Sequence, residues 1–126
     1  MRNRERLTEK LVRAAEPRSK AWQIFDSDVL GLSICIYPSG GRSFMFDYRA
    51  AGRQRRLTIG RWPEWNVTAA RERAKAARRR ELLAAAAALM AERGFAGVRL
   101  EDIGAAAGVS GPAMYRHFAG KQDVLA

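Results

Sequence analysis

The amino-acid sequence predicts an α+β fold, with a small sheet in its first half and helices in its second. Apolar and polar residues alternate between residues 32 and 59, which is the period of half-buried strands. Residues 67–93 contain neither Gly nor Pro, so the helical pattern there is unbroken. Residues 100–118 have the pattern of two short helices around a Gly-centred turn. We therefore expect a small antiparallel β-sheet with a backing helix in residues 1–77, followed by a three-helix helix-turn-helix domain in residues 78–126.

The first elements are a short helix and a series of strands. Thr8 is placed to cap a helix over residues 9–15, and Pro17 ends that helix. Strands are expected after it, over residues 22–25, 32–37, 43–48 and 54–59. The last three of these form a meander with one apolar and one polar face. On the final strand, Leu57 and Ile59 are predicted to point inward.

A single long helix is expected over residues 67–93. Asn66 can cap its start, and Gly94 can end it in a left-handed conformation. The helix would be about 40 Å long and would contain the junction between the two modules. Its second half carries an apolar stripe made of Leu82, Leu83, Ala86, Leu89 and Met90. We expect this stripe to pack on Phe95, Leu100, Ile103, Val109, Met114 and Phe118.

The charge distribution indicates a partner that carries phosphate groups. The chain of 126 residues has a net charge of +10. Residues 1–80 hold 19 Lys and Arg against 8 Asp and Glu, whereas residues 81–126 hold 4 against 5. Small soluble domains usually lie within about 2–8 charges of neutrality, so the excess in the first half favours a nucleic acid. Binding to a membrane surface is the rival interpretation, but no segment has the amphipathicity and aromatic content that it needs.

Other classes of function lack the residues they require. The apolar run at residues 82–91 is too short to span a bilayer, and no apolar core follows Arg2 as in a signal peptide. Cys35 is the only cysteine and His117 the only histidine, so we expect neither a disulfide nor a metal or other cofactor. A cytoplasmic, nucleoid-associated protein with no membrane partner is therefore expected.

The second module has the pattern of a helix-turn-helix, which sets its second helix into a major groove of DNA. Ser110 is placed to cap that helix, and Pro112 lies in its first turn, where the missing N–H costs nothing. Further motifs are AERGF at residues 91–95, DI at 102–103, AGVS at 107–110, MYRHF at 114–118, GK at 120–121 and Leu125. Over residues 81–126 this pattern resembles the N-terminal DNA-binding domain of TetR-type transcriptional repressors.

The TetR resemblance implies specific DNA contacts. It puts Gly111, Pro112 and Ala113 at the groove-facing start of the second helix, where contact with a thymine methyl is possible. Capping and packing alone are the alternative role for this segment. Val98 stands where the family often has a Thr that caps the preceding helix and touches phosphate. Arg99 beside it can supply a charged substitute.

A phosphate clamp is expected from the end of the second helix, made of Tyr115, Arg116, His117 and Lys121. The resemblance supports this role for Tyr115, His117 and Lys121. Arg116 can reach either a phosphate or a guanine edge. The alternatives are a core aromatic for Tyr115 and a helix-end residue bonded to the backbone for His117.

The first module carries another set of motifs. They are LT at residues 7–8, DSDVLG at 26–31, PSG at 38–40, YR at 48–49, GRQRRLTIGR at 52–61, Pro63 and AR at 70–71. In order and spacing they are similar to the arm-binding N-terminal domain of phage and integrative-element tyrosine recombinases, over residues 7–80. This resemblance implies that a small sheet, backed by a helix, enters a DNA groove. The recombinase catalytic domain and the TetR ligand-binding domain have no counterpart here, so strand exchange is not expected and dimerisation is left open.

The candidate DNA contacts of the sheet are polar residues near its last turn and on the outward face of its last strand. These are Arg49, Gln54, Arg56 and Thr58. Arg and Gln can read guanine and adenine edges or hold phosphates. The alternative is a solvated edge strand whose charges oppose aggregation. Arg53 and Arg55 have inward parity and are weaker candidates.

Structural roles are assigned to two further groups of charged residues. Arg71 and the other arginines of the long helix are expected on a solvated face with a general electrostatic role. Asp26, Asp28 and Asp47 are expected to form turn hydrogen bonds.

Together these patterns predict a non-enzymatic protein that binds double-stranded DNA, a TetR-like transcriptional regulator carrying an integrase-like arm-binding module. One alternative is a non-catalytic recombination accessory, or a truncated integrase, that binds arm-type sites in DNA integration. Another is a structural or defence-related protein that uses both folds to meet protein partners.

Overall fold

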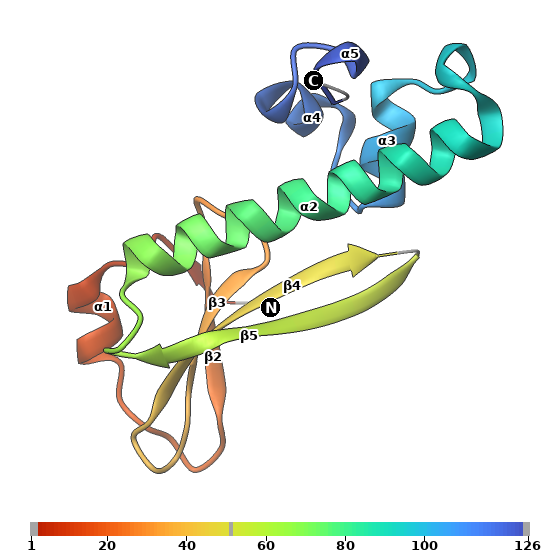
Figure 1. Ribbon diagram of the computed structural model, residues 1–126. Helices are drawn as coiled ribbons and strands as arrows, with labels where there is room; N and C mark the ends of the chain where they lie inside the picture. The colour runs from red at the N-terminus through yellow and green to blue at the C-terminus, as the bar shows by residue number, and fades with distance from the viewer. Residues whose placement is uncertain (1–2, 51, 125–126) are drawn as a thin grey trace. The chain divides into compact units, whose positions relative to one another are not determined.

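The computed structural model describes residues 3–50 and 52–124. Its elements are β1 (Arg4–Glu5), α1 (Glu9–Ala14), β2 (Trp22–Asp26), β3 (Leu32–Ile36), β4 (Arg42–Ala50), β5 (Arg53–Trp62), α2 (Val67–Arg93), the 3-10 turn η1 (Phe95–Gly97), α3 (Leu100–Ala106), α4 (Gly111–His117) and α5 (Lys121–Val124) (Figure 1). The described residues form two compact units: one reaches to Asp47 and includes Arg56–Ala76, and the other joins Tyr48–Arg55 to the residues from Ala77 onward. The α+β class predicted from the sequence is confirmed, and each predicted helix and strand is present.

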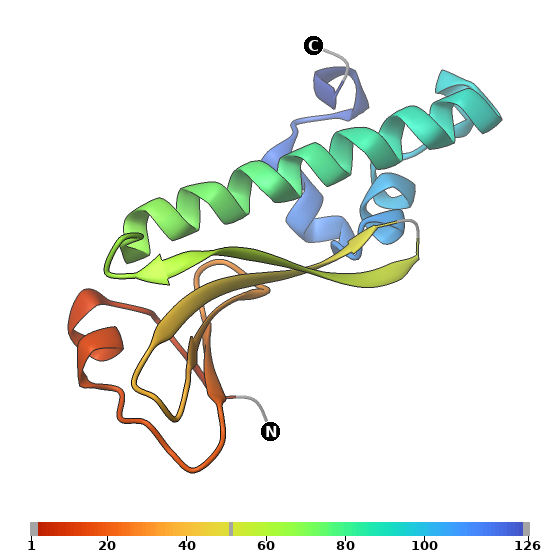
Figure 2. The same cartoon turned by 60° about the horizontal axis from the view of Figure 1, so that its bottom comes forward.

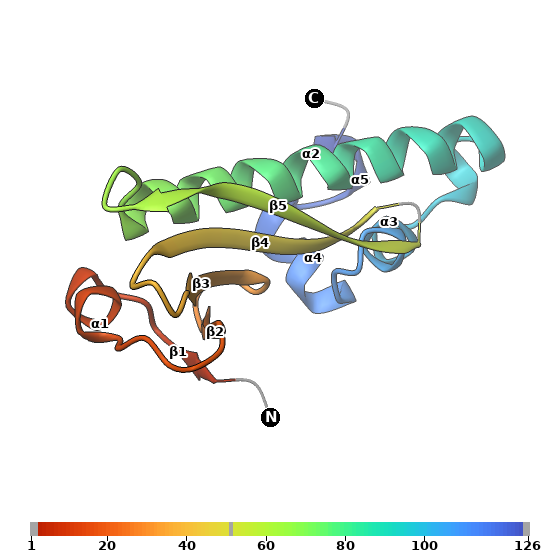
Figure 3. The same ribbon diagram turned by 90° about the horizontal axis from the view of Figure 1, so that it is seen from below.

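The sheet has the strand order β1-β2-β3-β4-β5 (Figure 3). β2 pairs with β3 and β3 with β4 in antiparallel register, but β1 runs parallel to β2. The sheet is therefore mixed, and the expectation of a purely antiparallel sheet is wrong at this edge. Arg4 and Glu5 are exposed and have no strand periodicity. Their pairing depends on backbone bonds that sequence does not reveal: Phe25 N–H donates to Asn3 O (2.7 Å) and Ser27 N–H to Glu5 O (3.0 Å).

One face of the sheet forms the core of the first unit. Ile34 lies between Ile24 on β2 and Phe44 on β4, and Leu32 lies opposite Phe46. All five side chains are buried. The first turns of α2 lie along the sheet (Figures 1 and 3) and bury Val67, Ala70 and Ala74, which are spaced by three and four residues. All five residues of β3 are buried, Ser33 and Cys35 included, so the predicted alternation of a buried and a solvated face does not hold on that strand.

Caps fix where the helices of the first unit begin. Leu11 N–H donates to Thr8 Oγ1 (3.1 Å), and Ala69 N–H donates to Asn66 Oδ1 (2.7 Å). Both predicted caps are confirmed. Glu9 makes a further contact that the sequence pattern does not predict. Its carboxylate accepts from Trp62 Nε1 (3.0 Å) and from Val67 N–H (2.7 Å), so α1 holds the end of β5 and the start of α2 together.

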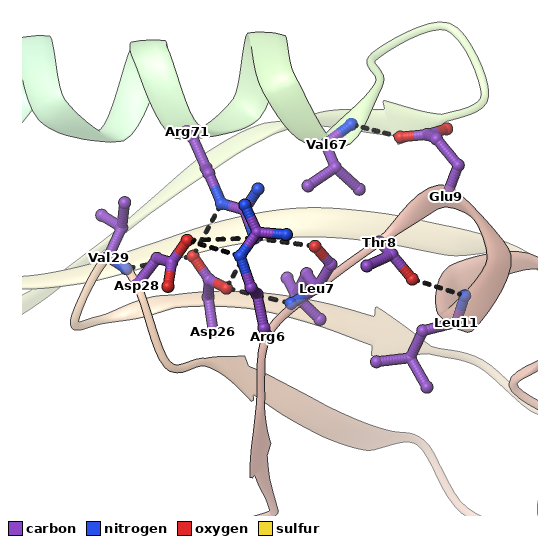
Figure 4. Close-up of polar contacts among 10 residues, drawn as sticks. All are labelled: Arg6, Leu7, Thr8, Glu9, Leu11, Asp26, Asp28, Val29, Val67 and Arg71. Carbon is purple, nitrogen blue, oxygen red and sulfur yellow. Dashed lines mark hydrogen bonds and ion pairs between the residues drawn. The ribbon is translucent and has the colours of Figure 1, made fainter.

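A buried ion pair joins α2 to the first strands (Figure 4). Asp26 is fully buried and accepts from Arg71 Nε and Nη2, each at 3.0 Å. Leu7 N–H and Val29 N–H also donate to its two oxygens at 3.0 Å, and Arg71 Nη2 donates to Leu7 O at 2.7 Å. Burial raises the pKa of Asp26, but the bonds from Arg71, Leu7 and Val29 and the charge of Arg71 outweigh it, so the pKa lies below its usual range.

The expectation that Arg71 lies on a solvated face is therefore wrong. Arg71 follows Val67 by four residues and precedes Ala74 by three, which places it on the buried face of α2. Asp26 does form the expected turn bond to Val29, but its main partner is Arg71.

The second unit has its own core. Leu82 and Ala86 of α2 pack with residues of α3, α4 and the turn between them, and Figures 1 and 2 show α3 and α4 beside the second half of α2. The other buried members are Val98, Leu100, Ile103, Ala107, Val109, Met114 and Phe118. Two predicted members differ: Phe95 is 41% exposed and Leu83 is 37% exposed. Phe95 falls in η1, directly after Gly94 reverses the chain with φ 76°.

We predict that Arg71→Ala lowers the free energy of unfolding by about 3–5 kcal/mol, because it leaves the Asp26 carboxylate buried without its cation. Lys75→Ala is the matched control. Lys75 lies one turn further along α2 in an exposed pair with Glu72 (3.6 Å), and its loss should cost about 0.5 kcal/mol or less. Urea denaturation of both variants measures the difference. Equal losses would show that the buried pair contributes no more than an exposed one.

Candidate nucleic-acid interface

An exposed row of cationic and amide side chains runs along the start of β5. Arg53, Gln54, Arg55 and Arg56 are all exposed, and beyond them Leu57 and Ile59 are half-buried while Thr58 is exposed. The predicted alternation is therefore present only from Arg56 onward. Arg53 and Arg55 are exposed despite their inward parity. Arg49 on β4 is exposed as well.

Arg56 is held by an acid on the neighbouring strand. Its Nε donates to Asp47 Oδ1 at 2.7 Å and its Nη2 donates to Asp47 Oδ2 at 3.1 Å. The bond and charge of Asp47 raise the pKa of Arg56, so the guanidinium stays charged. Asp47 was expected to form a turn hydrogen bond, but it pairs with Arg56 instead. Counting outward from the predicted turn at residues 51–52 would have placed Asp47 opposite Arg56.

The helix-turn-helix of the second unit depends on close approach of α3 and α4. The turn contains Gly108 with φ 74°, a conformation that favours glycine. A Cβ on Gly104 would lie 2.6 Å from both Met114 Cγ and Val109 O. Ser110 caps α4 as predicted, because its Oγ accepts from Ala113 N–H at 3.3 Å. The start of α4 is thus fixed by a cap and by a glycine contact.

The predicted contact residues at the start of α4 differ in accessibility. Pro112 and Ser110 are exposed, whereas Gly111 and Ala113 are half-buried. Ala113 packs against the core of the unit. Packing is therefore an established part of its role, and its contact with a base stays a prediction.

Tyr115 and Arg116 project from α4 to solvent. Tyr115 is 56% exposed, so the alternative of a core aromatic is wrong. Its hydroxyl donates to Glu101 Oε1 of α3 at 3.0 Å, and this bond and the charge of Glu101 raise the pKa of Tyr115. The phenol therefore stays protonated, with its one O–H directed at Glu101. Glu101 was not found from the sequence, because nothing local pairs it with a residue fourteen positions away.

The remaining expectations concern residues around these helices. The side chains of His117 and Lys121 lie outside the part of the structure that is described, as does Leu125, so their DNA contacts stay predictions. Val98 is fully buried and belongs to the core, which explains why an apolar residue stands there. The start of α3 is bonded by Asp102, whose carboxylate accepts from Arg99 N–H at 3.0 Å.

Among the described residues, no cluster of three His, Cys, Asp or Glu side chains is arranged to hold a metal ion. Among the same residues, no helix combines the length and apolar character needed to cross a membrane.

Two family models match the chain. Residues 7–92 match the model described as Arm DNA-binding domain, and residues 82–126 match the model described as bacterial regulatory proteins, tetR family. The first match covers more than half of the chain, so the chain belongs to the Arm DNA-binding domain family. The two matches overlap at residues 82–92, which lie inside α2.

Curated relatives support the first match. The chain is 32% identical over 73 residues to the integrase of Shigella phage Sf6, and equally to the prophage integrase IntS of Escherichia coli (strain K12). Each alignment covers 58% of this chain and 18% of the relative. Both resemblances seen in the sequence are thereby confirmed.

We predict that Gly104→Ala destabilises the second unit by about 1–3 kcal/mol, because the carbonyl of Val109 cannot yield to a new methyl group. Amide hydrogen exchange across α3 and α4 measures this loss. Gly111→Ala is the matched control, since its nearest neighbour is Cγ of the exposed Glu101 side chain at 3.2 Å. Faster exchange in both variants alike would contradict the predicted close approach.

Proposed function

We propose that this chain binds double-stranded DNA through two surfaces, as a TetR-like transcriptional regulator that carries an arm-type DNA-binding module. The exposed row from Arg53 to Arg56 carries the proposal for the first module. Four adjacent donors on one strand suit a ribbon that enters a groove, where phosphates attract the cations and base edges accept hydrogen bonds. Arg49 and Thr58 extend this surface.

The proposal for the second module rests on α4. Its cap orients the first turn, and the exposed Pro112, Tyr115 and Arg116 lie along seven residues of helix. Once its hydroxyl turns away from Glu101, Tyr115 can donate to a phosphate oxygen, and Arg116 can donate to a phosphate or to guanine. His117 and Lys121 are proposed to complete the phosphate clamp.

The proposed role is non-enzymatic. Both matched regions correspond to binding modules, and the proposed sites contain donors and cations but no paired acid and base. We propose a boundary between the modules near residues 77 and 78, inside α2, and a cytoplasmic, nucleoid-associated location. If both modules bind one duplex, binding of the first raises the effective concentration of the second near its site. The affinity of the whole chain for DNA then exceeds that of either module alone.

We predict that Lys121→Ala weakens binding to all duplexes by a similar factor and reduces the slope of log affinity against log salt by about one, because one phosphate contact is lost. Fluorescence anisotropy over a salt series measures the slope. Lys75→Ala removes the same charge from α2 and should leave the slope nearly unchanged. Equal slopes for Lys121→Ala and the parent would remove Lys121 from the proposed clamp.

The second candidate is a non-catalytic recombination accessory that binds arm-type sites. Its support is the similarity of the first module to two integrases. The chain spans about 18% of the length of those relatives, so their activity is not carried over to it.

Footprinting on DNA that flanks the gene distinguishes the candidates. For a regulator we expect protection of a palindromic operator, because paired half-sites mirror a two-fold arrangement of helix-turn-helix units. Protected direct repeats at the end of an integrated element would instead favour the accessory. Binding that is undetectable at moderate salt and unchanged by Arg56→Ala with Tyr115→Ala would favour the protein-interaction alternative.

A further inference from the structure

The ion pair between Asp47 on β4 and Arg56 on β5 differs from the other exposed pairs of the first unit. It is bidentate, with two bonds of 2.7 and 3.1 Å. The Asp47 side chain is only 9% exposed, whereas that of Arg56 is 48% exposed. By contrast, Arg6 and Asp28 are joined by one bond at 2.9 Å with both side chains open to solvent. The Asp47 carboxylate is therefore a fixed support beneath a solvent-facing guanidinium.

The geometry leaves one edge of the guanidinium free for a ligand. Arginine has five N–H donors, and Asp47 takes one from Nε and one from Nη2. The donors left over lie on Nη1 and on the second hydrogen of Nη2, along the far end of the group. Two parallel donors at that end match the N7 and O6 acceptors that guanine presents in the major groove.

The same pair makes Arg56 a poor general contact for phosphate. A cation with a carboxylate at hydrogen-bond distance is nearly neutral when viewed from a phosphate, so its long-range attraction is weak. Within the described part of the chain, neither Arg53 nor Arg55 forms an ion pair of this kind. On β5, Arg53 and Arg55 can therefore attract the phosphates of the DNA backbone. Arg56 beside them is held in one orientation and has its charge balanced by Asp47.

We propose that Asp47 is a positioning residue that makes Arg56 a guanine-reading contact rather than a phosphate contact. This inference rests on the proposed DNA binding of the first module. Holding the side chain in one conformation lowers the conformational entropy that binding would otherwise cost. Balancing its charge removes the attraction that Arg56 would otherwise have for any DNA. Affinity through Arg56 then depends on a guanine at the matching position, which increases the difference in affinity between right and wrong sequences.

The test compares Asp47→Asn with the parent on two probes. One is a guanine-containing duplex selected by the parent from random-sequence DNA, and the other is poly(dA·dT), which contains no guanine. Asn keeps the size of the side chain but removes its negative charge. It also replaces one of the two oxygens that accept from Arg56 with an NH2 group. We expect tighter binding to poly(dA·dT), a salt slope larger by about one, and a roughly tenfold or greater loss of the preference for the selected duplex.

A 7-deazaguanine substitution identifies the atom that is read. Removing N7 from the critical guanine should weaken the parent but have little effect on Asp47→Asn or Arg56→Ala. Arg56→Lys keeps the charge without the planar fork, so it should bind poly(dA·dT) as well as the parent and lose the response to 7-deazaguanine.

The control for charge is Glu72→Gln, which raises the net charge equally from an exposed position on α2. Thermal unfolding checks that Asp47→Asn is folded. If Asp47→Asn only lowers stability and keeps both the preference and the 7-deazaguanine response, the role of Asp47 is structural and the inference is wrong. If the parent binds no duplex even at low salt, the proposed function fails and this inference fails with it.

Discussion

The buried pair of Asp26 and Arg71 is the constraint on which the first unit depends. Burying a carboxylate away from water costs free energy unless hydrogen-bond donors and a cation replace the water. Each missing donor leaves part of the negative charge uncompensated, so all the bonds must form together. Here the donors come from the segment before α1, from the turn after β2 and from α2. Satisfying one side chain therefore fixes three segments that are far apart in the sequence.

Glu9 fixes the other end of the same arrangement. By accepting from Trp62 and Val67, it fixes the point where β5 ends and α2 begins. β5 is thus anchored at its last residue, Trp62, while its first four residues are exposed. The same strand can serve as a structural element at one end and as a binding surface at the other. Exposed Arg56 and Tyr115 are each bonded to an acid on the neighbouring element, which limits the conformations that a ligand must select.

The long helix α2 connects the two modules of the chain and contributes residues to the core of each. Val67, Ala70 and Ala74 close the sheet, and Leu82 and Ala86 belong to the core of the helix-turn-helix. The overlap of the two family matches at residues 82–92 lies in this shared helix. Neither core is complete without it, so a join inside α2 preserves the apolar face of each module.

The sequence by itself determined the α+β class, strands β2 to β5, helices α1 to α4, the caps at Thr8, Asn66 and Ser110, and both family resemblances. These follow from periodicity and from local hydrogen bonds, which act over a few residues. Tertiary structure alone decided the parallel edge at Arg4–Glu5, the burial of Arg71, and the acids that hold Arg56 and Tyr115. Each of these joins residues that are distant in the chain, and a charged side chain carries no periodic signal of whether it meets water or an opposite charge.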